Sequence, residues 1–370
     1  MDSDLLPGMV TVALSGPLAV GAGQGSRYVV AVIGLIVSVR AKVSDRTSAF
    51  ARYGGGMRVI ERCCRGKKAD QSLNEDGLVV TDDFAAVVDG VTSKSVRRSW
   101  RPSGGVVAKD LLLEAIAALP ADATMRQVQS SLDGRLRAEY ARCGCADDVV
   151  DTALFEREPW ERLQANAVIY SARRHEAWLF GDCQIMVNGV QTPTVKRVDK
   201  LLGELRSFAA QALALDDSEN DAVSHTSPVP TATAGPTSIA DTSATTSETG
   251  DVKSLDLPPA IIDPAREMIL PFLRLQSRFA NRRGEYGYFV FDGFTDPTYL
   301  IRMVPVNPGD EVVLASDGYP LLRPTMAESE RELNRLRRDD PRLIRDYRTT
   351  KGFVPGQESF DDRTYLRFVA

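Results

Sequence analysis

The sequence predicts a mixed α/β fold in which a sandwich of β-strands is flanked by helices. Short apolar runs bounded by turn residues, typical of strands, recur from Met57 to the C-terminus. Stretches with helical spacing of apolar residues stand between these runs. Strands predominate on both sides of one long polar segment, with the helices outside them. Because 43% of the 370 residues are hydrophobic, the chain can bury a large core.

The first part of this pattern contains a hairpin and two helices. Asp82-Asp83 separates two apolar runs and predicts a tight turn. Gly104-Gly105 opens a helical pattern that Pro120 stops. The expected elements are strands at 57–63, 77–81 and 84–88 and helices at 104–119 and 125–143.

The second part continues with a meander and further helices. Turn residues at Arg173-Arg174 and Gly181-Asp182 separate three β-type runs. Asp263-Pro264 is a typical helix start, because proline fits the first helical position. The expected elements are strands at 165–172, 176–180, 184–188, 286–291, 299–306, 312–315 and 364–369, and helices at 201–215, 263–275 and 325–338.

Two segments do not follow this pattern. Residues 1–56 contain no Glu and hold one apolar run between Arg27 and Arg40, too short for a bilayer span of about 20 residues. We interpret them as an extension outside the fold, such as a misassigned start, with a late-starting signal peptide as the alternative. Residues 216–257 are rich in Ser, Thr, Pro, Ala and Asp, which predicts a disordered insertion into a domain of residues 57–370. This insertion is either a passive linker or a phosphorylation target or docking tether.

Composition limits the chemistry of any metal site. The only histidines are His175 and His225, so an imidazole-rich zinc site has few ligands. Cys143-Gly144-Cys145 has no second pair at zinc spacing, and five irregularly spaced cysteines indicate reduced thiols and a cytoplasmic location. Carboxylates remain, and they suit Mg²⁺ or Mn²⁺. The net charge of -5 does not indicate binding to nucleic acid, which requires a positively charged surface.

Acidic residues stand at the edges of several apolar runs, where a hard cation could collect oxygen ligands from several strands. Each Asp-Gly pair taken alone is also an ordinary turn dipeptide, as Asp292-Gly293 illustrates. It is their order and context that favour metal ligation. The segments are Asn74-Glu75-Asp76, Val88-Asp89-Gly90, Phe180-Gly181-Asp182, Ala315-Ser316-Asp317-Gly318 and Asp361-Asp362-Arg363-Thr364.

In this order, the five segments resemble the motifs of the PP2C-type (PPM) metal-dependent protein serine/threonine phosphatases. The resemblance covers Met57 to the C-terminus, interrupted by the insertion. It implies a central β-sandwich flanked by helices in four αββα layers. It also implies two Mn²⁺ or Mg²⁺ ions, with a third as an open alternative, and a bridging hydroxide that attacks a phosphomonoester in line.

The resemblance also implies a role for each motif residue. Asp89 would bridge both ions, with Glu75 and the Gly90 carbonyl on one and Asp317 and Asp361 on the other. Asp182 would hold a weaker third ion or serve as a turn residue. Asp76 and Asp362 would support the ligands without binding metal. Asp89, Asp317 and Asp361 are the candidate catalytic residues.

The surroundings of these motifs depart from the family pattern. Val91-Thr92-Ser93-Lys94 stands where the family often has His-Gly-Gly, and Gln71 stands where it commonly has a substrate-binding arginine. Lys67 or Lys68, or Arg65, could supply a phosphate-binding charge, although a lysine offers a point charge rather than a bidentate fork. The alternative for these basic residues is a solvated turn.

These observations leave three functional hypotheses. The first is an active phosphatase acting on phosphoserine or phosphothreonine in proteins, or on a small phosphoester, without nucleic-acid or membrane partners. The second is a pseudophosphatase that serves as a binding or regulatory module; no neutral residue replaces an acid at 75, 89, 317 or 361, which favours the enzyme. A nucleotide-binding domain is disfavoured, because Gly54-Gly55-Gly56 neither follows a clear strand nor opens a helix.

Overall fold

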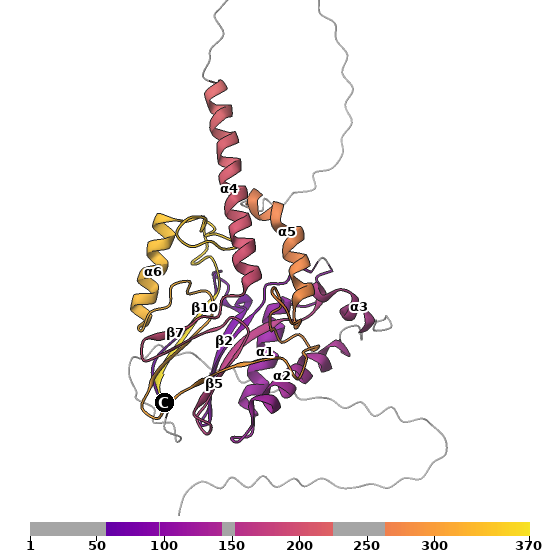
Figure 1. Ribbon diagram of the computed structural model, residues 1–370, viewed down its shortest axis with the longest axis vertical. Coiled ribbons are helices and arrows are strands. Elements are labelled where there is room, and N and C mark those ends of the chain that lie inside the picture. The colour runs from indigo at the N-terminus through magenta and orange to yellow at the C-terminus, as the bar shows by residue number, and fades with distance from the viewer. Residues whose placement is uncertain (1–56, 96, 143–151, 225–262) are drawn as a thin grey trace, which may run out of the picture. The chain divides into compact units, whose positions relative to one another are not determined.

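Two five-stranded antiparallel sheets form the centre of the fold in the computed structural model (Figure 1). The structure describes residues 57–95, 97–142, 152–224 and 263–370. In sheet A the strand order is β1 (Arg58–Arg65), β10 (Arg363–Val369), β9 (Glu311–Ala315), β6 (Gln184–Val187) and β7 (Val190–Thr192). In sheet B it is β2 (Asp76–Val80), β3 (Phe84–Gly90), β4 (Ala165–Ser171), β5 (Glu176–Phe180) and β8 (Arg302–Pro305). The predicted β-sandwich is confirmed.

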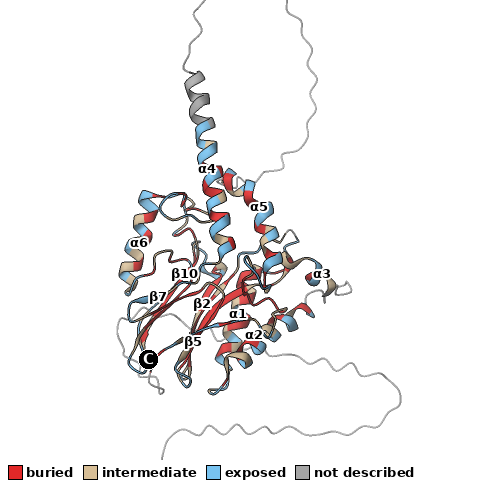
Figure 2. Ribbon diagram, viewed as in Figure 1, coloured by how far each residue is buried: buried red, intermediate tan, exposed pale blue. Residues whose placement is uncertain are grey.

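Strand β3 shows how the sequence builds two cores at once. Successive side chains of a strand point to opposite faces of the sheet. Phe84, Ala86 and Val88 therefore join the core beneath the helices, while Ala85 and Val87 join the core between the two sheets. Both faces are covered over residues 84–88, which form an unbroken apolar run. Figure 2 shows that the sheets are largely buried.

Helices cover the outer faces of the sandwich. Helices α1 (Gly104–Ala117) and α2 (Met125–Tyr140) pack on sheet B, and each begins with a side-chain cap, from Ser103 and Thr124 respectively. On sheet A, Tyr319, Leu322 and Met326, the first residue of α6 (Met326–Asp339), pack near Tyr365 of β10. The helices thus lie outside the sheets, as the sequence predicted.

A further helix pair lies beyond one end of the sheets, where Figure 1 shows α4 and α5 side by side. Helix α4 (Arg197–Ser224) packs against α5 (Pro264–Gln276), whose N-terminus is capped by the Asp263 side chain. Val198 and Leu202 of α4 meet Ile269 and Leu273 of α5. The remaining elements are α3 (Thr152–Arg157) and short 3₁₀ helices at Gln71–Leu73, Pro159–Glu161 and Ser277–Phe279.

Three strands differ from the sequence prediction. The predicted strand at 286–291 forms only isolated bridges, from Tyr288 to Ala280 and from Phe291 to Ala165. Its side chains alternate between two faces as expected. It contacts β4 at Ala165, beyond the last residue pair of β4 and β5, and pairs with β4 there through Phe291 alone. The predicted strand at 299–306 shortens to β8, and β7 was not predicted.

Helix α4 extends past the predicted end at Leu215 to Ser224, into the segment predicted to be a disordered insertion. The rest of that segment, the extension at 1–56, the Cys143-Gly144-Cys145 motif and His225 lie outside the described residues. Their assignments stay predictions. In the part of the chain that is described, no helix has both the length and the apolar character needed to cross a membrane.

Candidate metal and phosphate site

In sheet B, the acidic motifs lie at one end of the strands. Asp89 is the penultimate residue of β3 and is paired in register with Asp76 at the start of β2 and with Asn166 near the start of β4. Asp182 follows the end of β5, and Phe180 lies opposite Ala167 of β4. Antiparallel pairing therefore places Asp89 and Asp182 at the same edge.

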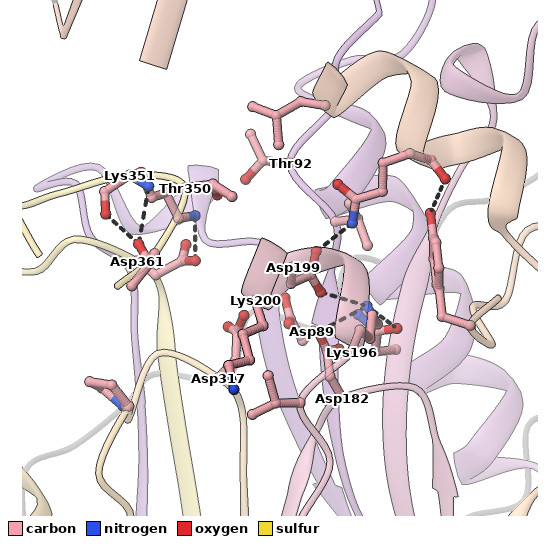
Figure 3. Close-up of a pocket in the computed structure, with 18 of the residues that line it drawn as sticks. Asp89, Thr92, Asp182, Lys196, Asp199, Lys200, Asp317, Thr350, Lys351 and Asp361 are labelled. Carbon is pink, nitrogen blue, oxygen red and sulfur yellow. Dashed lines mark hydrogen bonds and ion pairs between the residues drawn. The ribbon is translucent and has the colours of Figure 1, made fainter. Parts of the chain in front are cut away.

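In sheet A, the same edge carries the C-terminal motifs. Asp317 follows β9, and Asp361 precedes β10. Ala315 is paired with Tyr365, so the end of β9 and the start of β10 are neighbours. Asp89, Asp182, Asp317 and Asp361 line one cavity of about 700 Å³, together with the Gly90 backbone. Figure 3 shows Asp361 on one side of the cavity and Asp89 and Asp182 on another.

The motif glycines permit backbone contacts that no other residue would allow. A Cβ on Gly90 would lie 2.1 Å from the Gly105 carbonyl oxygen, and one on Gly318 would lie 2.0 Å from the Asp362 carbonyl oxygen. Gly181 has a φ of +105°, and its Cβ would lie 2.1 Å from Asn166 Oδ1. Gly90 and Gly105 together bring the N-terminus of α1 against Glu75. The glycines therefore set the close packing around the acids.

Asp89, which is half-buried, and Asp317, which is exposed to the cavity, are carboxylates to which the structure gives no hydrogen bond or ion pair within the described ranges. Burial raises the pKa of Asp89 well above its usual range, and the charges of Asp317, Asp76 and Asp182 raise it further. Burial likewise raises the pKa of Asp317, with added repulsion from Asp361 and Asp182. Concentrated negative charge of this kind favours a bound cation.

Glu75 lies behind the cavity and is held by short hydrogen bonds. Ser103 Oγ, at the cap of α1, donates to Glu75 Oε1 at 2.7 Å, and Thr92 Oγ1 donates to Glu75 Oε2 at 2.6 Å. Lys67 Nζ lies 3.5 Å from the same Oε2. Glu75 is not among the residues that line the cavity.

Lys67 links three of the predicted acids. Its Nζ lies 3.0 Å from Asp361 Oδ1 and 3.3 Å from Asp362 Oδ2, in addition to its contact with Glu75. Burial alone would lower the pKa of Lys67, but the three carboxylates raise it. Asp362 also accepts the backbone N–H groups of Lys67 and Glu75, at 2.7 and 3.0 Å. Asp362 therefore links the segment after β1 to the Glu75 segment.

Two more lysines face the acids. Lys351 forms a very close ion pair with Asp361. Burial would raise the pKa of Asp361, but Lys351 and Lys67 hold it below its usual range. Lys196 Nζ lies 2.9 Å from Asp182 Oδ2 and 3.5 Å from Asn166 Oδ1. Asp182 and Asp361 thus already face ammonium groups, in contrast to Asp89 and Asp317.

The donor set around Asp89 fits a hard divalent cation. Within the described part of the chain, no three His, Cys, Asp or Glu side chains form a group that could hold a metal ion as they stand. However, Asp182 Oδ1 and Asp76 Oδ2 are buried oxygens without a hydrogen-bond partner among the residues that the structure describes. Burial and the neighbouring Asp361 and Asp362 charges raise the pKa of Asp76 to about 7. Carboxylate oxygens of this kind are the ligands that Mg²⁺ and Mn²⁺ take.

Sequence reasoning singled out the acids but not the cations that face them. Lys94, Lys196, Arg266 and Lys351 all line the cavity. None of them belongs to a recurrent dipeptide such as Asp-Gly. Lys94 lies in the loop after β3, Lys196 immediately before α4, Arg266 in α5 and Lys351 in the 341–360 loop. Of the predicted phosphate-binding residues, Lys67 is engaged with the acids and Lys68 is exposed outside the cavity.

Comparisons of the whole chain with solved structures find phosphatases of similar fold. No family model and no curated protein matches the sequence. Similar solved structures include a serine/threonine phosphatase of Mycobacterium tuberculosis, PstP/Ppp (15% identity, 84% of this chain and 98% of that chain, TM-score 0.38). Others are the PPM Ser-Thr phosphatase MsPP from Mycobacterium smegmatis (12%, 84% and 98%, 0.35) and Stp1 from Staphylococcus aureus (11%, 88% and 99%, 0.37). At these identities and TM-scores, no activity, metal or substrate is carried over from them.

Proposed function

We propose that this protein is a metal-dependent phosphatase that hydrolyses phosphomonoesters, with phosphoserine or phosphothreonine in proteins as the first substrate class to test. The observation that carries the proposal is the pair Asp89 and Asp317, two carboxylates that line one cavity, repel each other and form no ion pair with a described residue. Keeping such carboxylates charged in the folded protein costs free energy unless a cation binds there.

The chain's own residues have distinct parts in this proposal. Asp89 and Asp317, with the Gly90 carbonyl and Asp182, would hold Mn²⁺ or Mg²⁺, and Asp361 would contribute after exchange of its lysine contacts. The bound metal would supply a water of lowered pKa and would neutralise charge on the phosphoryl group. Ser103 and Thr92 fix the orientation of Glu75, and Asp362 fixes the position of its backbone.

The test is hydrolysis of p-nitrophenyl phosphate by the full chain with Mn²⁺, with and without chelator. We expect metal-dependent turnover that Asp89→Asn or Asp317→Asn each reduces at least about a hundredfold, the loss typical of an essential electrostatic group. Asp82→Asn, in the exposed turn between β2 and β3, is the matched control and should leave turnover unchanged. Turnover that survives both core substitutions would contradict the proposal, and a phosphopeptide panel then addresses substrate class.

A second candidate function is a pseudophosphatase that acts as a binding or regulatory module. The specific observation in its favour is that internal ammonium groups already neutralise part of the acidic set, since Lys67 contacts Glu75, Asp361 and Asp362. On this hypothesis, metal-replete protein would neither turn over any phosphoester nor gain thermal stability from Mn²⁺. Turnover by the wild type would exclude it.

A further inference from the structure

Lys94 is a half-buried lysine that forms no ion pair in the described parts of the chain, although the Asp199 carboxylate lies within electrostatic range. It stands in the loop after β3, four residues beyond Gly90, and its side chain lines the cavity. No hydrogen bond or ion pair joins its Nζ to a described residue, although Lys67, Lys196 and Lys351 each bind carboxylates. Enclosed lysines are normally paired, because an unpaired buried charge costs free energy. An anion in the cavity would supply the missing partner.

Arg266 reaches the same cavity from α5. Its Nη1 donates to the Thr350 carbonyl, and its Nε and Nη2 have no hydrogen-bond partner among the described side chains and backbone groups. Burial lowers the pKa of Lys94; attraction to Asp199 opposes this, and repulsion from Lys351, Arg266 and Lys196 adds to it. Lys94 and Arg266 therefore line the same cavity with donors that no described carboxylate binds.

The cavity is also lined by carboxylates that form no ion pair with a described residue, which indicates how charge is distributed on a ligand that would fit it. Asp89 and Asp317 carry the unpartnered negative charge. A phosphate monoester presents both features that such a cavity could satisfy: oxygens that bridge to bound cations, and further oxygens that accept hydrogen bonds from ammonium and guanidinium groups.

Gln71, at the position where the motif resemblance implies a phosphate-binding arginine, forms hydrogen bonds away from the cavity. Gln71 bonds to its own loop, with Nε2 2.7 Å from the Lys68 carbonyl and Oε1 2.8 Å from the Gly66 amide nitrogen. It does not line the cavity. Lys67 is held by three carboxylates. Recognition of the phosphoryl group therefore needs other donors.

We propose that Lys94 and Arg266 form the subsite that binds the phosphoryl oxygens of the substrate, in place of the absent arginine at position 71. The inference rests on the proposed phosphatase function for the identity of the substrate, but anion binding by these two side chains can be measured without turnover. Arg266 lies immediately after the 225–262 segment and Lys94 lies in the loop after β3, so the subsite joins two parts of the chain that are distant in sequence.

The first measurement is the affinity of the full chain for inorganic phosphate, by titration calorimetry with and without Mn²⁺. Lys94→Met should weaken binding about ten- to a hundredfold, the value of one hydrogen bond between charged groups. Lys94→Arg should restore affinity to within about threefold, because the charge is kept. Lys200→Met removes the same charge from an exposed position lining the same cavity and should change affinity less than about threefold.

The second measurement is steady-state hydrolysis of p-nitrophenyl phosphate with Mn²⁺. Lys94→Met and Arg266→Met should raise KM more than they lower kcat, because they remove contacts to oxygens that do not change partners in the reaction. Phosphate binding that depends on Lys94 in a protein without turnover would support the subsite while refuting the phosphatase. Wild-type protein that binds no phosphate, or Lys94→Met protein that binds it with unchanged affinity, would overturn the subsite.

Discussion

Replacing Asp89 by Asn should have opposite effects on stability with and without metal. In the metal-free protein, Asp89 is a half-buried carboxylate whose pKa is raised well above its usual range, first by burial and then by Asp317. At pH 7 the unfolded chain carries this group fully ionised, so a raised pKa in the folded state means that ionisation lowers the free energy of unfolding. Asparagine cannot ionise and removes that cost. Metal-free Asp89→Asn protein should therefore be more stable than wild type.

The size of the effect follows from the partial burial of the carboxylate. A buried polar group left unsatisfied costs about 1–3 kcal/mol, and the half-buried Asp89 should lie near the lower end, at about 1 kcal/mol. For a domain of roughly 300 residues this raises Tm by about 2 °C. Mn²⁺ at a hundred times its Kd should stabilise wild type by about 2.7 kcal/mol and should have little effect on the variant. The order of stability therefore reverses on addition of metal.

Thermal unfolding in EDTA and in Mn²⁺ at pH 7 measures both halves of this prediction. Asp82→Asn, on the exposed turn of the same hairpin, should follow wild type in both conditions. A lower Tm for Asp89→Asn than for wild type in EDTA would refute the reasoning, because it would mean that the carboxylate is satisfied in the folded protein. Equal Tm values of wild type in EDTA and Mn²⁺ would refute the metal site.

Two further predictions concern the packing around the acids. Lys67→Met should lower the metal-free free energy of unfolding by about 3–5 kcal/mol in denaturant titrations, because it leaves paired carboxylates without their cation, whereas exposed Lys68→Met should change it by less than about 0.5 kcal/mol. Gly105→Ala would place a Cβ 2.6 Å from Glu75 Oε1 and should destabilise the protein by about 1–3 kcal/mol. Gly134→Ala, whose Cβ would have no described atom within 4 Å, should stabilise α2 by about 0.5–1 kcal/mol. Equal effects of the two substitutions would contradict the close approach at Gly105.

The sequence was sufficient to predict the elements whose patterns are local. Helices α1, α2, α5 and α6 begin near the expected residues, because caps such as Ser103 and Thr124 and the proline after Asp263 act within one turn. The strand at 286–291 was wrong, since its alternation fixes which face each side chain takes but not whether a neighbouring strand is free to pair. Pairing is a property of the assembled sheet.

The site divides in the same way. Asp89, Asp182, Asp317 and Asp361 could be predicted to meet because each stands at a strand end that antiparallel pairing brings to one edge. The ion pairs that engage Asp182 and Asp361 could not, since their lysines lie in loop and connecting segments and reach the cavity only through tertiary packing. The positions of the acids can thus be predicted from motifs at strand ends, whereas the positions of the lysines depend on how the connecting segments pack.

This division predicts a pH dependence for phosphate binding that the acidic motifs alone would not produce. Lys94 has its pKa lowered to about 8, by burial first and by repulsion from Lys351, Arg266 and Lys196, against attraction to Asp199. Binding needs the protonated amine, so phosphate affinity should be full below about pH 8 and fall as the pH rises through that value. Lys94→Arg keeps its charge to far higher pH and should retain affinity at pH 9.5. A wild-type affinity that is constant from pH 7 to 9.5 would show that the Lys94 amine does not contact the bound anion.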